Sequence, residues 1–360
     1  MRRLEITVKD LTIEDEKEWQ TFVYESNNGT VYHLLEWRDI LKKEYQFKPE
    51  YLLARDSDAK ICGVLPLFYV KNFRGARLES LPFSIYGGPI ATTTDAFSML
   101  IKAAIEKSIE MKSKYLVLKM QHDLQKNVIF ENNLIEDKYY IRSVLELSEN
   151  QDETWAKLSR DKKRQVKNAR KMNVTVRIAE NLDDVKSFYE LELLTRKKHG
   201  LPTPSLRYFY DIWRTLEAKN LVRILLAEHN EKAIAGTMLF TFKDTILYAI
   251  GASDMRYLKY RPNNLVLWEG IEWGCRNGYR YFDFGGTPSD HLSLLDFKKR
   301  WGAINNFYPY YYFPQKYSIK SDTAAQNNNG IVQRAGTYLF KKMPICISKI
   351  VGPPLIKYFG

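Results

Sequence analysis

The hydrophobic pattern in the last third of the chain predicts a strand, a helix and a second strand. Residues 246–252, ILYAIGA, are apolar and rich in β-forming types, which indicates a strand. After Pro262, apolar side chains recur at spacings of three and four, a helical pattern that ends at Asn277-Gly278. Residues 281–284, YFDF, form a short strand that two glycines end. Such a unit joins parallel strands, and ligand sites lie beyond their carboxyl ends, where Asp283 is found.

The pattern before this unit predicts two helices and then a meander of three strands. The helices are expected at residues 185–197 and 208–216, and the strands at 222–227, 233–242 and 245–252. Short polar turns separate the three strands, as in antiparallel hairpins. Residues 51–147 also mix short strands with helices. Mixed strands covered by helices predict an α/β fold with a mixed (α+β) sheet in each half.

The length of 360 residues suits two domains rather than one. A polar stretch, SENQD, separates two halves of similar pattern, so we expect a first domain at 1–150 and a second at 151–317. The remaining segment, 318–360, begins with a polar linker and continues as an apolar and basic tail. Such a tail suits either a bilayer interface or packing on the second domain.

The chain carries 55 Lys and Arg against 43 Asp and Glu, a net charge of +12. This excess favours an anionic partner, such as a nucleic acid, a phosphorylated carrier or an anionic membrane, although it also serves solubility alone. The densest basic segment is 159–171, SRDKKRQVKNARK, which is predicted to be a helix. We predict that this helix binds phosphates through Lys163, Arg164, Lys167 and Arg170, with a merely solvated surface as the alternative.

Several classes of protein are disfavoured by the sequence. The three cysteines, Cys62, Cys275 and Cys346, lie far apart and form no CxxC pair, so we expect neither a metal site nor a disulfide framework. Reduced thiols, an N-terminus without the apolar core of a signal peptide, and the lack of eighteen consecutive apolar residues indicate a cytoplasmic protein. No Ser-His-Asp, HExxH or P-loop motif is present.

Three motifs in a fixed order carry a resemblance to a known family. The series YAIGAS, RPNNLVLWEGIEWGCRNGYRYFDFGG and LLDFKKRWGA resembles the second domain of FemAB-type acyltransferases, which belong to the GNAT superfamily. The resemblance extends through residues 158–171 and 193–213 and, more weakly, to TVYHLLEW at 30–37, so that it covers most of residues 30–313. It implies two GNAT-like domains in tandem. Some members of this family transfer amino acids from aminoacyl-tRNA to peptidoglycan precursors.

Pattern and resemblance together suggest candidate site residues. The catalytic candidates are Asp283, as a general base at a strand end, and Tyr248, which would hydrogen-bond substrate from the central strand. In GNAT enzymes a helix N-terminus attracts the donor's phosphates, because its free N–H groups and dipole favour anions. The expected substrate-binding residues are Trp37, Arg196, His199, Arg261, Asn263, Asn264 and Lys298.

Some of these residues also have a purely structural interpretation. Asp283 equally suits an ion pair with a nearby Lys or Arg, and Trp37 equally suits the core. Basic residues such as Arg196 and His199 also favour the dipole at the end of a helix. The sequence leaves these alternatives open.

Two departures from the family pattern narrow the expected substrates. Leu35 and Glu36 stand near the place where peptidoglycan-building members carry a lysine that contacts substrate phosphate, which argues against a nucleotide-linked muropeptide. The glycine-rich loop that binds acetyl-CoA is absent, and Pro262 lacks one N–H donor at the helix N-terminus, which argues against ordinary acetyl-CoA use.

The resemblance implies an N-acyltransferase that moves an acyl or aminoacyl group onto an amine of a cell-envelope or polysaccharide precursor. The donor, aminoacyl-tRNA or acyl-CoA, would be a substrate, and no resident cofactor is expected. One alternative is an acyl-CoA-dependent GNAT N-acetyltransferase; another is a non-catalytic GNAT scaffold that binds RNA or an anionic glycolipid. The expected place is the cytoplasm, at the inner face of the membrane if the basic tail contacts the bilayer.

Overall fold

The computed structural model describes residues 6–72, 75–121, 126–314 and 330–356. The chain divides into two compact units. The first consists of residues 1–140 and 307–327, and the second of residues 141–306 and 328–359, as far as these are described. The first division falls a few residues before the polar linker expected near residue 150. The assignment of functional domains to 1–150 and 151–317 stays a prediction.

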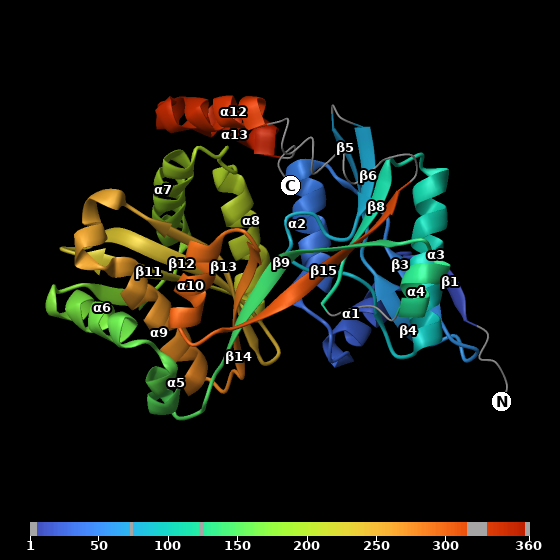
Figure 1. The fold of residues 1–360 in the computed structure, drawn as a ribbon, viewed down its shortest axis with the longest axis horizontal. Coiled ribbons are helices and arrows are strands. Elements are labelled where there is room, and N and C mark those ends of the chain that lie inside the picture. Colours follow the sequence, from blue (N-terminus) through green and yellow to red (C-terminus); the bar gives the residue numbers. More distant parts are fainter. Residues whose placement is uncertain (1–5, 73–74, 122–125, 315–329, 357–360) are drawn as a thin grey trace. The chain divides into compact units, whose positions relative to one another are not determined.

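The first unit builds two groups of strands with helices packed on them (Figure 1). Its elements are β1 (Thr7–Asp10), α1 (Glu16–Glu25), η1 (Val31–His33), α2 (Leu35–Tyr45), β2 (Lys48–Pro49), β3 (Leu52–Arg55), β4 (Ile61–Leu65), β5 (Phe68–Asn72), β6 (Gly75–Glu79), β7 (Ile90–Ala91), α3 (Thr94–Glu110), β8 (Tyr115–Lys119), α4 (Lys126–Glu131) and the first half of β9 (Ile135–Glu146). One group is the antiparallel sheet β1-β3-β4-β7. In the other, β6 pairs parallel with β8 and antiparallel with β5.

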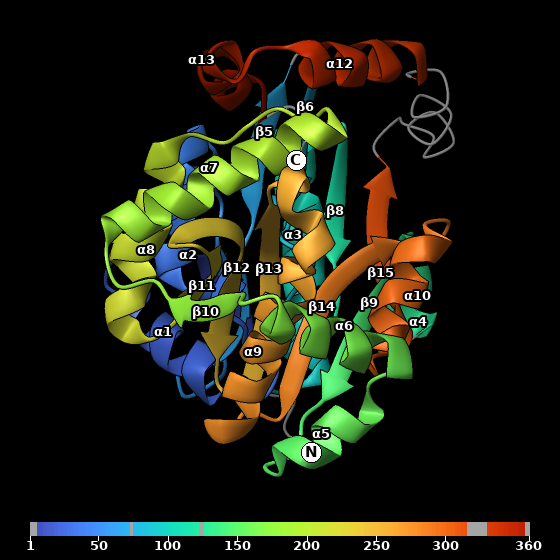
Figure 2. The ribbon, with the colours of Figure 1, turned by 90° about the vertical axis from the view of Figure 1, so that its left-hand side faces the viewer.

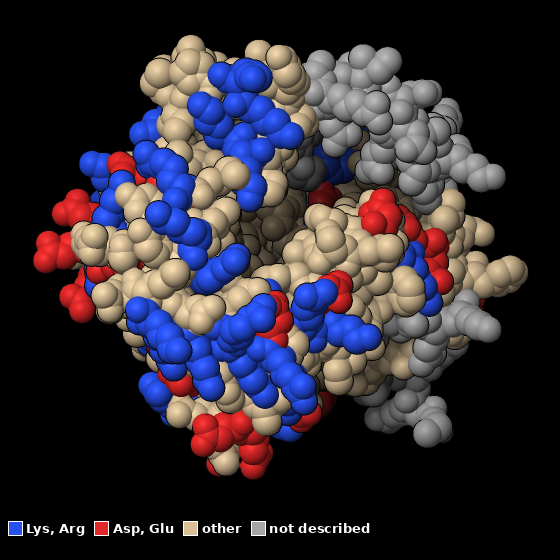
Figure 3. Space-filling view, turned by 60° about the vertical axis from the view of Figure 1, so that its left-hand side comes forward, with Lys and Arg blue, Asp and Glu red and all other residues tan. Residues whose placement is uncertain are grey.

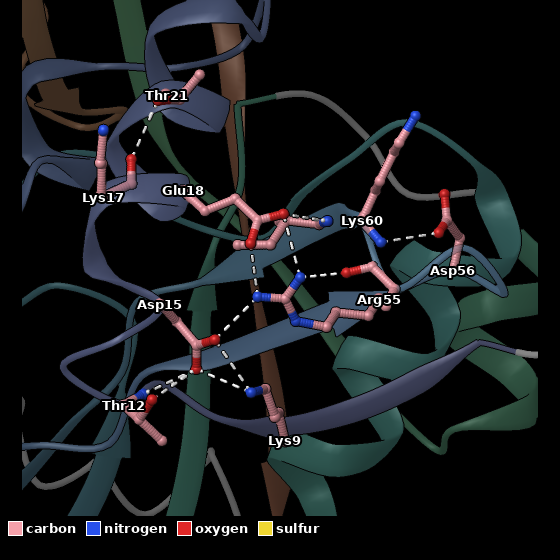
Figure 4. Close-up of polar contacts among 11 residues, drawn as sticks. Lys9, Thr12, Asp15, Lys17, Glu18, Thr21, Arg55, Asp56 and Lys60 are labelled. Carbon is pink, nitrogen blue, oxygen red and sulfur yellow. Dashed lines mark hydrogen bonds and ion pairs between the residues drawn. The ribbon is translucent and has the colours of Figure 1, made fainter.

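Helix α1 is tied to its sheet by a cluster of charged side chains (Figure 4). Arg55 on β3 donates to Asp15 over 2.8 Å and to Glu18 over 2.6 Å, while Lys9 on β1 donates to Asp15 over 3.0 Å. Burial raises the pKa of Asp15, but the hydrogen bonds from Lys9, Arg55 and Thr12 outweigh it and hold the pKa well below its usual range. The cluster is structural, because each carboxylate is already used by a basic partner.

The last strand, β15 (Ile304–Pro314), passes from the second unit to the first. Within the first unit it pairs antiparallel with β8, and Tyr310 also meets Tyr140 of β9 with ring centroids 4.9 Å apart. Because Pro309 lacks an N–H donor, the sequence predicts an edge strand or an interrupted strand here. The first of these alternatives is wrong, because β15 has β9 on one side and β8 on the other. Pro309 uses its carbonyl instead, which accepts from Met120 N over 3.1 Å.

The second unit is a twisted sheet with helices on both faces (Figure 2). Its elements are the second half of β9, α5 (Gln151–Lys157), α6 (Arg160–Lys171), β10 (Thr175–Ile178), α7 (Leu182–His199), α8 (Leu206–Leu216), η2 (Glu217–Lys219), β11 (Val222–His229), β12 (Lys232–Phe242), β13 (Thr245–Ser253), η3 (Met255–Tyr260), α9 (Pro262–Arg276), β14 (Tyr281–Pro288), α10 (Leu292–Arg300), α12 (Gly330–Lys342) and α13 (Ile345–Ile356). The strand order is β10-β11-β12-β13-β14, antiparallel except for the parallel pair β13–β14.

The predicted strand–helix–strand unit is confirmed as β13, α9 and β14. The two central helices, α7 and α9, cover opposite faces of the sheet, as side-chain alternation along β12 shows. An added Cβ at Gly236 would meet Phe188 of α7, whereas Leu239 contacts Gly270 of α9. Small residues at both contacts let the helices approach the sheet closely. The predicted meander of three strands is confirmed as β11, β12 and β13.

The C-terminal segment forms two helices, α12 and α13, that pack on the C-terminal part of α7 (Figures 1 and 2). Gly200 ends α7 in a left-handed conformation, and an added Cβ there would overlap the Thr337 carbonyl of α12. Thr203 donates to the Ser348 carbonyl of α13 over 2.8 Å. Packing on the second unit, one of the two alternatives for the tail, is thus observed. Most of the linker expected before these helices lies outside the described residues.

Candidate active site

Strands β13 and β14 diverge at the point where the sequence places the site. Their parallel pairing ends at Leu247 and Asp283. One residue later the register of β13 against β12 shifts, which leaves Ala249 as an extra residue in a β-bulge. Residues 248–251 are partly exposed, whereas Ile246 and Leu247 are buried. The divergence therefore exposes the backbone of β13 beside the middle of β14. The prediction that two glycines end this strand after residue 284 is wrong, because β14 continues through them to Pro288.

Asp283 is fully buried and accepts hydrogen bonds on both of its carboxylate oxygens. Arg142 Nε donates to Oδ2 over 2.7 Å, and the backbone N–H of Gly285 donates to Oδ1 over 2.8 Å. The ion-pair alternative from the sequence is thus observed, with Arg142 as a partner. A buried carboxylate held on both oxygens fixes the backbone at Gly285, which has a φ of 74° within β14. The role of Asp283 as a general base stays a prediction.

Lys298 of α10 contacts the backbone of the same glycine, Gly285. Its ammonium is buried and donates to the Gly285 carbonyl over 2.9 Å. Burial lowers the pKa of Lys298 to about 8, and the nearby Asp283 charge offsets part of that effect. Asp283, Gly285 and Lys298 therefore lie together at the middle of β14, and Lys298 titrates close to physiological pH.

Tyr248 lies on the opposite side of the divergence, at the bulge. Its ring is tilted against Phe282 and Phe284, with centroid distances of 6.4 and 6.3 Å. The hydroxyl lies against Gly251, where an added Cβ would overlap it. Burial raises the pKa of Tyr248 to about 12, and the nearby carboxylate of Glu192 adds to this. The phenol is therefore neutral near pH 7, so it can donate a hydrogen bond.

Arg196 and His199 occupy the last turn of α7, as the sequence predicts. Arg196 Nε donates over 2.5 Å to Glu192, a buried carboxylate whose pKa is raised by burial and only partly lowered by Arg196. Burial lowers the pKa of His199, and positive charges on Lys198, Lys341 and Arg196 lower it further. The end of α7 is thus a positively charged corner to which α12 contributes Lys341.

The N-terminus of α9 follows β13 through one 3-10 turn. Arg261 is its N-cap, in the left-handed conformation with φ 58°, and its side chain is exposed. Asn263 donates to the Ser253 hydroxyl over 3.2 Å, and Asn264 accepts from Lys162 of α6 over 3.3 Å. The sequence predicts an anion-binding corner here. The structure brings its three residues together at one helix end, next to the last residue of β13.

Helix α6 has the predicted basic surface. Val166 and Ala169 face the core, and an open depression on the outside is lined by Arg160, Lys163, Arg164, Lys167, Asn168 and Lys171. Two of the predicted phosphate ligands already have acidic partners, since Arg164 pairs with Asp161 over 2.7 Å and Arg170 pairs with Glu269 of α9 over 2.9 Å. Figure 3 shows Lys and Arg side chains gathered on this face of the molecule. One face of α6 therefore packs on the core, while the other presents cations to solvent.

Trp37 lies in the core of the first unit. Its side chain is only 2% exposed and its ring meets Tyr32 edge-on, with centroids 5.0 Å apart. These contacts agree with the core alternative that the sequence left open. A role of Trp37 in substrate binding stays a prediction.

Three residues of the second unit could be added to the site only from the structure. Arg142 belongs to a strand that the pattern predicts merely as the end of the first domain, and no local motif links it to Asp283. Glu192 lies four residues before Arg196, a spacing that indicates an ion pair on one helix face. Lys162 belongs to the predicted basic helix, but its ammonium is buried 4.4 Å from the centroid of the Phe297 ring.

The described part of the chain lacks both a metal-binding cluster and a membrane-spanning helix. It contains no group of three or more His, Cys, Asp or Glu that could hold a metal ion. Its helices include none that is both long and apolar enough to cross a membrane. The groups gathered around the opened pair of strands are a neutral phenol, a buried ammonium of lowered pKa and two basic corners.

The sequence is similar to those of known acyltransferases. Residues 156–299 match the acetyltransferase (GNAT) domain model. The lipid II:glycine glycyltransferase of Staphylococcus aureus strain MRSA252 is 21% identical over 80% of this chain and 88% of its own length. The enzyme of the same name from Staphylococcus haemolyticus is 31% identical over a shorter stretch, which is 26% of this chain and 24% of that protein.

Solved structures show the same fold. The crystal structure of FemX superimposes with a TM-score of 0.67 at 16% identity, over 85% of this chain and 96% of that chain. A tandem GNAT protein from the clavulanic acid biosynthesis pathway gives a TM-score of 0.54 at 10% identity, over 87% of this chain and 100% of that one. The fold of two GNAT-like halves expected from the sequence is confirmed. The chain is an acyltransferase with a GNAT domain at residues 156–299, and it is similar to enzymes of the FemAB type.

Proposed function

We propose that the protein transfers an aminoacyl group to an amine of a cell-envelope precursor. The observation that carries this proposal is the divergence of β13 and β14, which has Tyr248 and Lys298 on its two sides. The relatives from Staphylococcus are named lipid II:glycine glycyltransferases, and such a reaction needs a bound ester, a bound amine and stabilisation of an oxyanion. The residues around the opening can supply these.

The chemistry is an aminolysis of an ester. The acceptor nitrogen forms a bond to the acyl carbon, the ester C–O bond breaks, and the proton lost by nitrogen is taken up by the leaving oxygen or by water. Negative charge develops on the carbonyl oxygen before the C–O bond breaks. Tyr248 can donate a hydrogen bond to this oxygen, and the Lys298 ammonium can stabilise the same charge from the β14 side. Asp283 then acts by holding Gly285, the carbonyl partner of Lys298.

The donor would be held by the two basic surfaces of the second unit. A tRNA acceptor arm carries one phosphate per nucleotide, so it can contact the outer face of α6 and the N-terminus of α9 together. Lys162 links these elements, because it lies on α6 and donates to Asn264 of α9. Arg261 at the helix N-terminus would meet the phosphate nearest the ester. An acyl-CoA donor is the alternative, since its diphosphate also suits the end of α9.

The acceptor amine would approach from the end of α7. Arg196 and His199 lie there, and their positive surroundings favour an acceptor that carries phosphate. We place the protein at the cytoplasmic face of the membrane, where such precursors are assembled, with the C-terminal helices as the contact. This location follows from the proposed acceptor and from the basic tail.

A transfer assay with two donors tests the proposal. The protein is incubated with a labelled aminoacyl-tRNA pool or with acetyl-CoA, together with a lipid-linked disaccharide-peptide acceptor. We expect label on the acceptor from aminoacyl-tRNA, and its loss when the donor is first treated with ribonuclease. Transfer from acetyl-CoA alone would favour the acyl-CoA alternative. Absence of transfer from either donor, with tRNA still bound, would favour the binding scaffold.

A further inference from the structure

The two C-terminal helices carry exposed apolar side chains, which is unusual for a helix face that meets only water. On α13, Ser348, Gly352 and Ile356 are buried and recur every four residues, which defines the packed face. The opposite face carries Ile347 and Ile350, both exposed, and Ile350 is 76% exposed. The helix therefore turns small residues inward and larger apolar residues outward.

Helix α12 also has exposed apolar side chains beside a buried one. Phe340 is buried, whereas Tyr338 and Leu339 are 65% and 58% exposed. Lys341 and Lys342 follow directly and are exposed. Both helices lie across the end of α7, as two views of the ribbon agree (Figures 1 and 2). Four of their apolar side chains are exposed, and we call these residues together the outer tail surface: Tyr338, Leu339, Ile347 and Ile350.

The described charges of the two tail helices have one sign, since Lys341, Lys342 and Lys349 are exposed and neither helix contains Asp or Glu. Residues 330–360 contain five Lys and Arg and neither Asp nor Glu. Apolar and aromatic side chains surrounded by cations are what an interfacial helix presents to a bilayer with anionic headgroups. A second protein copy would need acidic groups to match these cations, and the tail offers a copy of itself none. Charge complementarity thus favours an anionic lipid surface as the occupant.

The inner side of the pair is fixed to the basic corner at the end of α7. An added Cβ at Gly352 would meet backbone atoms of Thr203, and one at Gly200 would overlap the Thr337 carbonyl. These close contacts lie within a few residues of His199. Lys341 is one turn beyond Thr337 on the same face of α12, so it lies toward the corner and adds its charge there. Whatever holds the outer tail surface also sets the position of this corner.

We propose that the outer tail surface seats the protein on an anionic bilayer and, through Gly200 and Gly352, holds the α7 corner at that surface. Under the proposed function, on which this last part rests, the corner then meets an acceptor presented by the membrane. Binding of the outer tail surface to the bilayer would fix the orientation of the protein as well as its location. A water-soluble acceptor would gain nothing from it.

Vesicle flotation tests membrane binding by the outer tail surface without any assay of turnover. The full chain is mixed with vesicles of phosphatidylglycerol and phosphatidylcholine, or of phosphatidylcholine alone. We expect binding to the anionic vesicles, weakened about tenfold or more by Ile347→Glu/Ile350→Glu, because two charges must then enter the interface. Ile13→Glu/Ile109→Glu is the matched control, since it changes the net charge equally at two positions of the first unit that are 82% and 52% exposed, and it should leave binding as it was.

Two results would contradict membrane binding by the outer tail surface. One is a wild-type protein that does not float with anionic vesicles, and the other is equal flotation of the wild type and Ile347→Glu/Ile350→Glu. Sedimentation of the same samples identifies a second copy as the occupant if the wild type dimerises and the double variant does not. That outcome also contradicts the proposal, because the surface would then be covered by protein.

The coupling to the corner is tested with Gly352→Val, which keeps the outer tail surface and disrupts the contact with Thr203. We expect it to float normally and to lose its preference for a lipid-linked acceptor in vesicles over the same acceptor freed of lipid. An unchanged preference would contradict the coupling. If wild type uses neither acceptor, the proposed function fails, while the flotation result still decides membrane binding by the outer tail surface.

Discussion

Arg142 Nε lies 2.7 Å from Oδ2 of Asp283, an ion pair that joins the second half of β9 to β14. The other carboxylate oxygen accepts from Gly285 N, so that the Asp283 side chain holds both the neighbouring strand β9 and the backbone of β14 at Gly285. Lys298 then uses the carbonyl of the same glycine. The pair therefore supports the ammonium at the opening of the strands.

Asp283→Asn should weaken this support while keeping the side chain's shape. We expect a loss of about 1–3 kcal/mol in the free energy of unfolding, because the charged hydrogen bond is weakened and Arg142 loses this carboxylate. Urea denaturation measures the loss. If turnover falls by about 10²-fold or more while stability is unchanged, Asp283 acts as the general base predicted from the sequence.

Because of Lys298, the rate of transfer should fall as the pH becomes alkaline. Its pKa is lowered by burial to about 8, so the protonated fraction falls as pH rises through that value. If the ammonium stabilises the oxyanion, kcat declines above about pH 8 and Lys298→Met is slow at every pH. Lys298→Arg, which stays charged, should remove this decline. A rate that rises through this pH range in the wild type and stays low in Lys298→Arg would assign Lys298 as a base.

Tyr248→Phe removes one hydroxyl and leaves the ring contacts with Phe282 and Phe284. Loss of one donor to an oxyanion typically lowers kcat by about 10²–10³-fold, and we expect a similar fall with little change in KM. Thermal unfolding serves as the control, since the ring packing is retained. Full activity in this variant would place the phenol outside the reaction.

The outer face of α6 should contribute salt-dependent affinity for tRNA. Each phosphate contact that is lost lowers the slope of log affinity against log salt by about 1, so Arg164→Ala/Lys167→Ala should reduce the slope by about 2. Lys42→Ala/Lys43→Ala on α2 changes the net charge equally at exposed positions of the first unit. If both double variants lower the slope by the same amount, only net charge matters and α6 is not the binding surface.

The sequence predicts the elements of the second unit well because their signals are local. Pro262, Asn277 and Gly278 mark the ends of α9, and alternating apolar residues mark the meander. The parallel pairing of β13 with β14 follows from the connection of a strand, a helix and a strand. Local rules are enough to place Tyr248 and Asp283 on neighbouring strands.

The partners of these residues could not be predicted, because they depend on long-range contacts. Arg142 meets Asp283 across 141 positions of sequence, and no periodicity relates the two. The exposure of Ile350 likewise follows from how Gly352 packs against Thr203, which only the tertiary structure shows. Pro309 leaves an edge strand and an interrupted strand open for β15, and only the pairing of β15 on both sides excludes the edge strand.

Aminoacyl transfer is tested most directly by the mass of the acceptor after a single turnover. Wild type and Tyr248→Phe are given the lipid-linked acceptor with aminoacyl-tRNA or with acetyl-CoA. We predict that wild type adds the mass of one aminoacyl group to the acceptor amine from tRNA, and that Tyr248→Phe does so far more slowly. An acetyl increment from acetyl-CoA, with none from aminoacyl-tRNA, would contradict the proposed function.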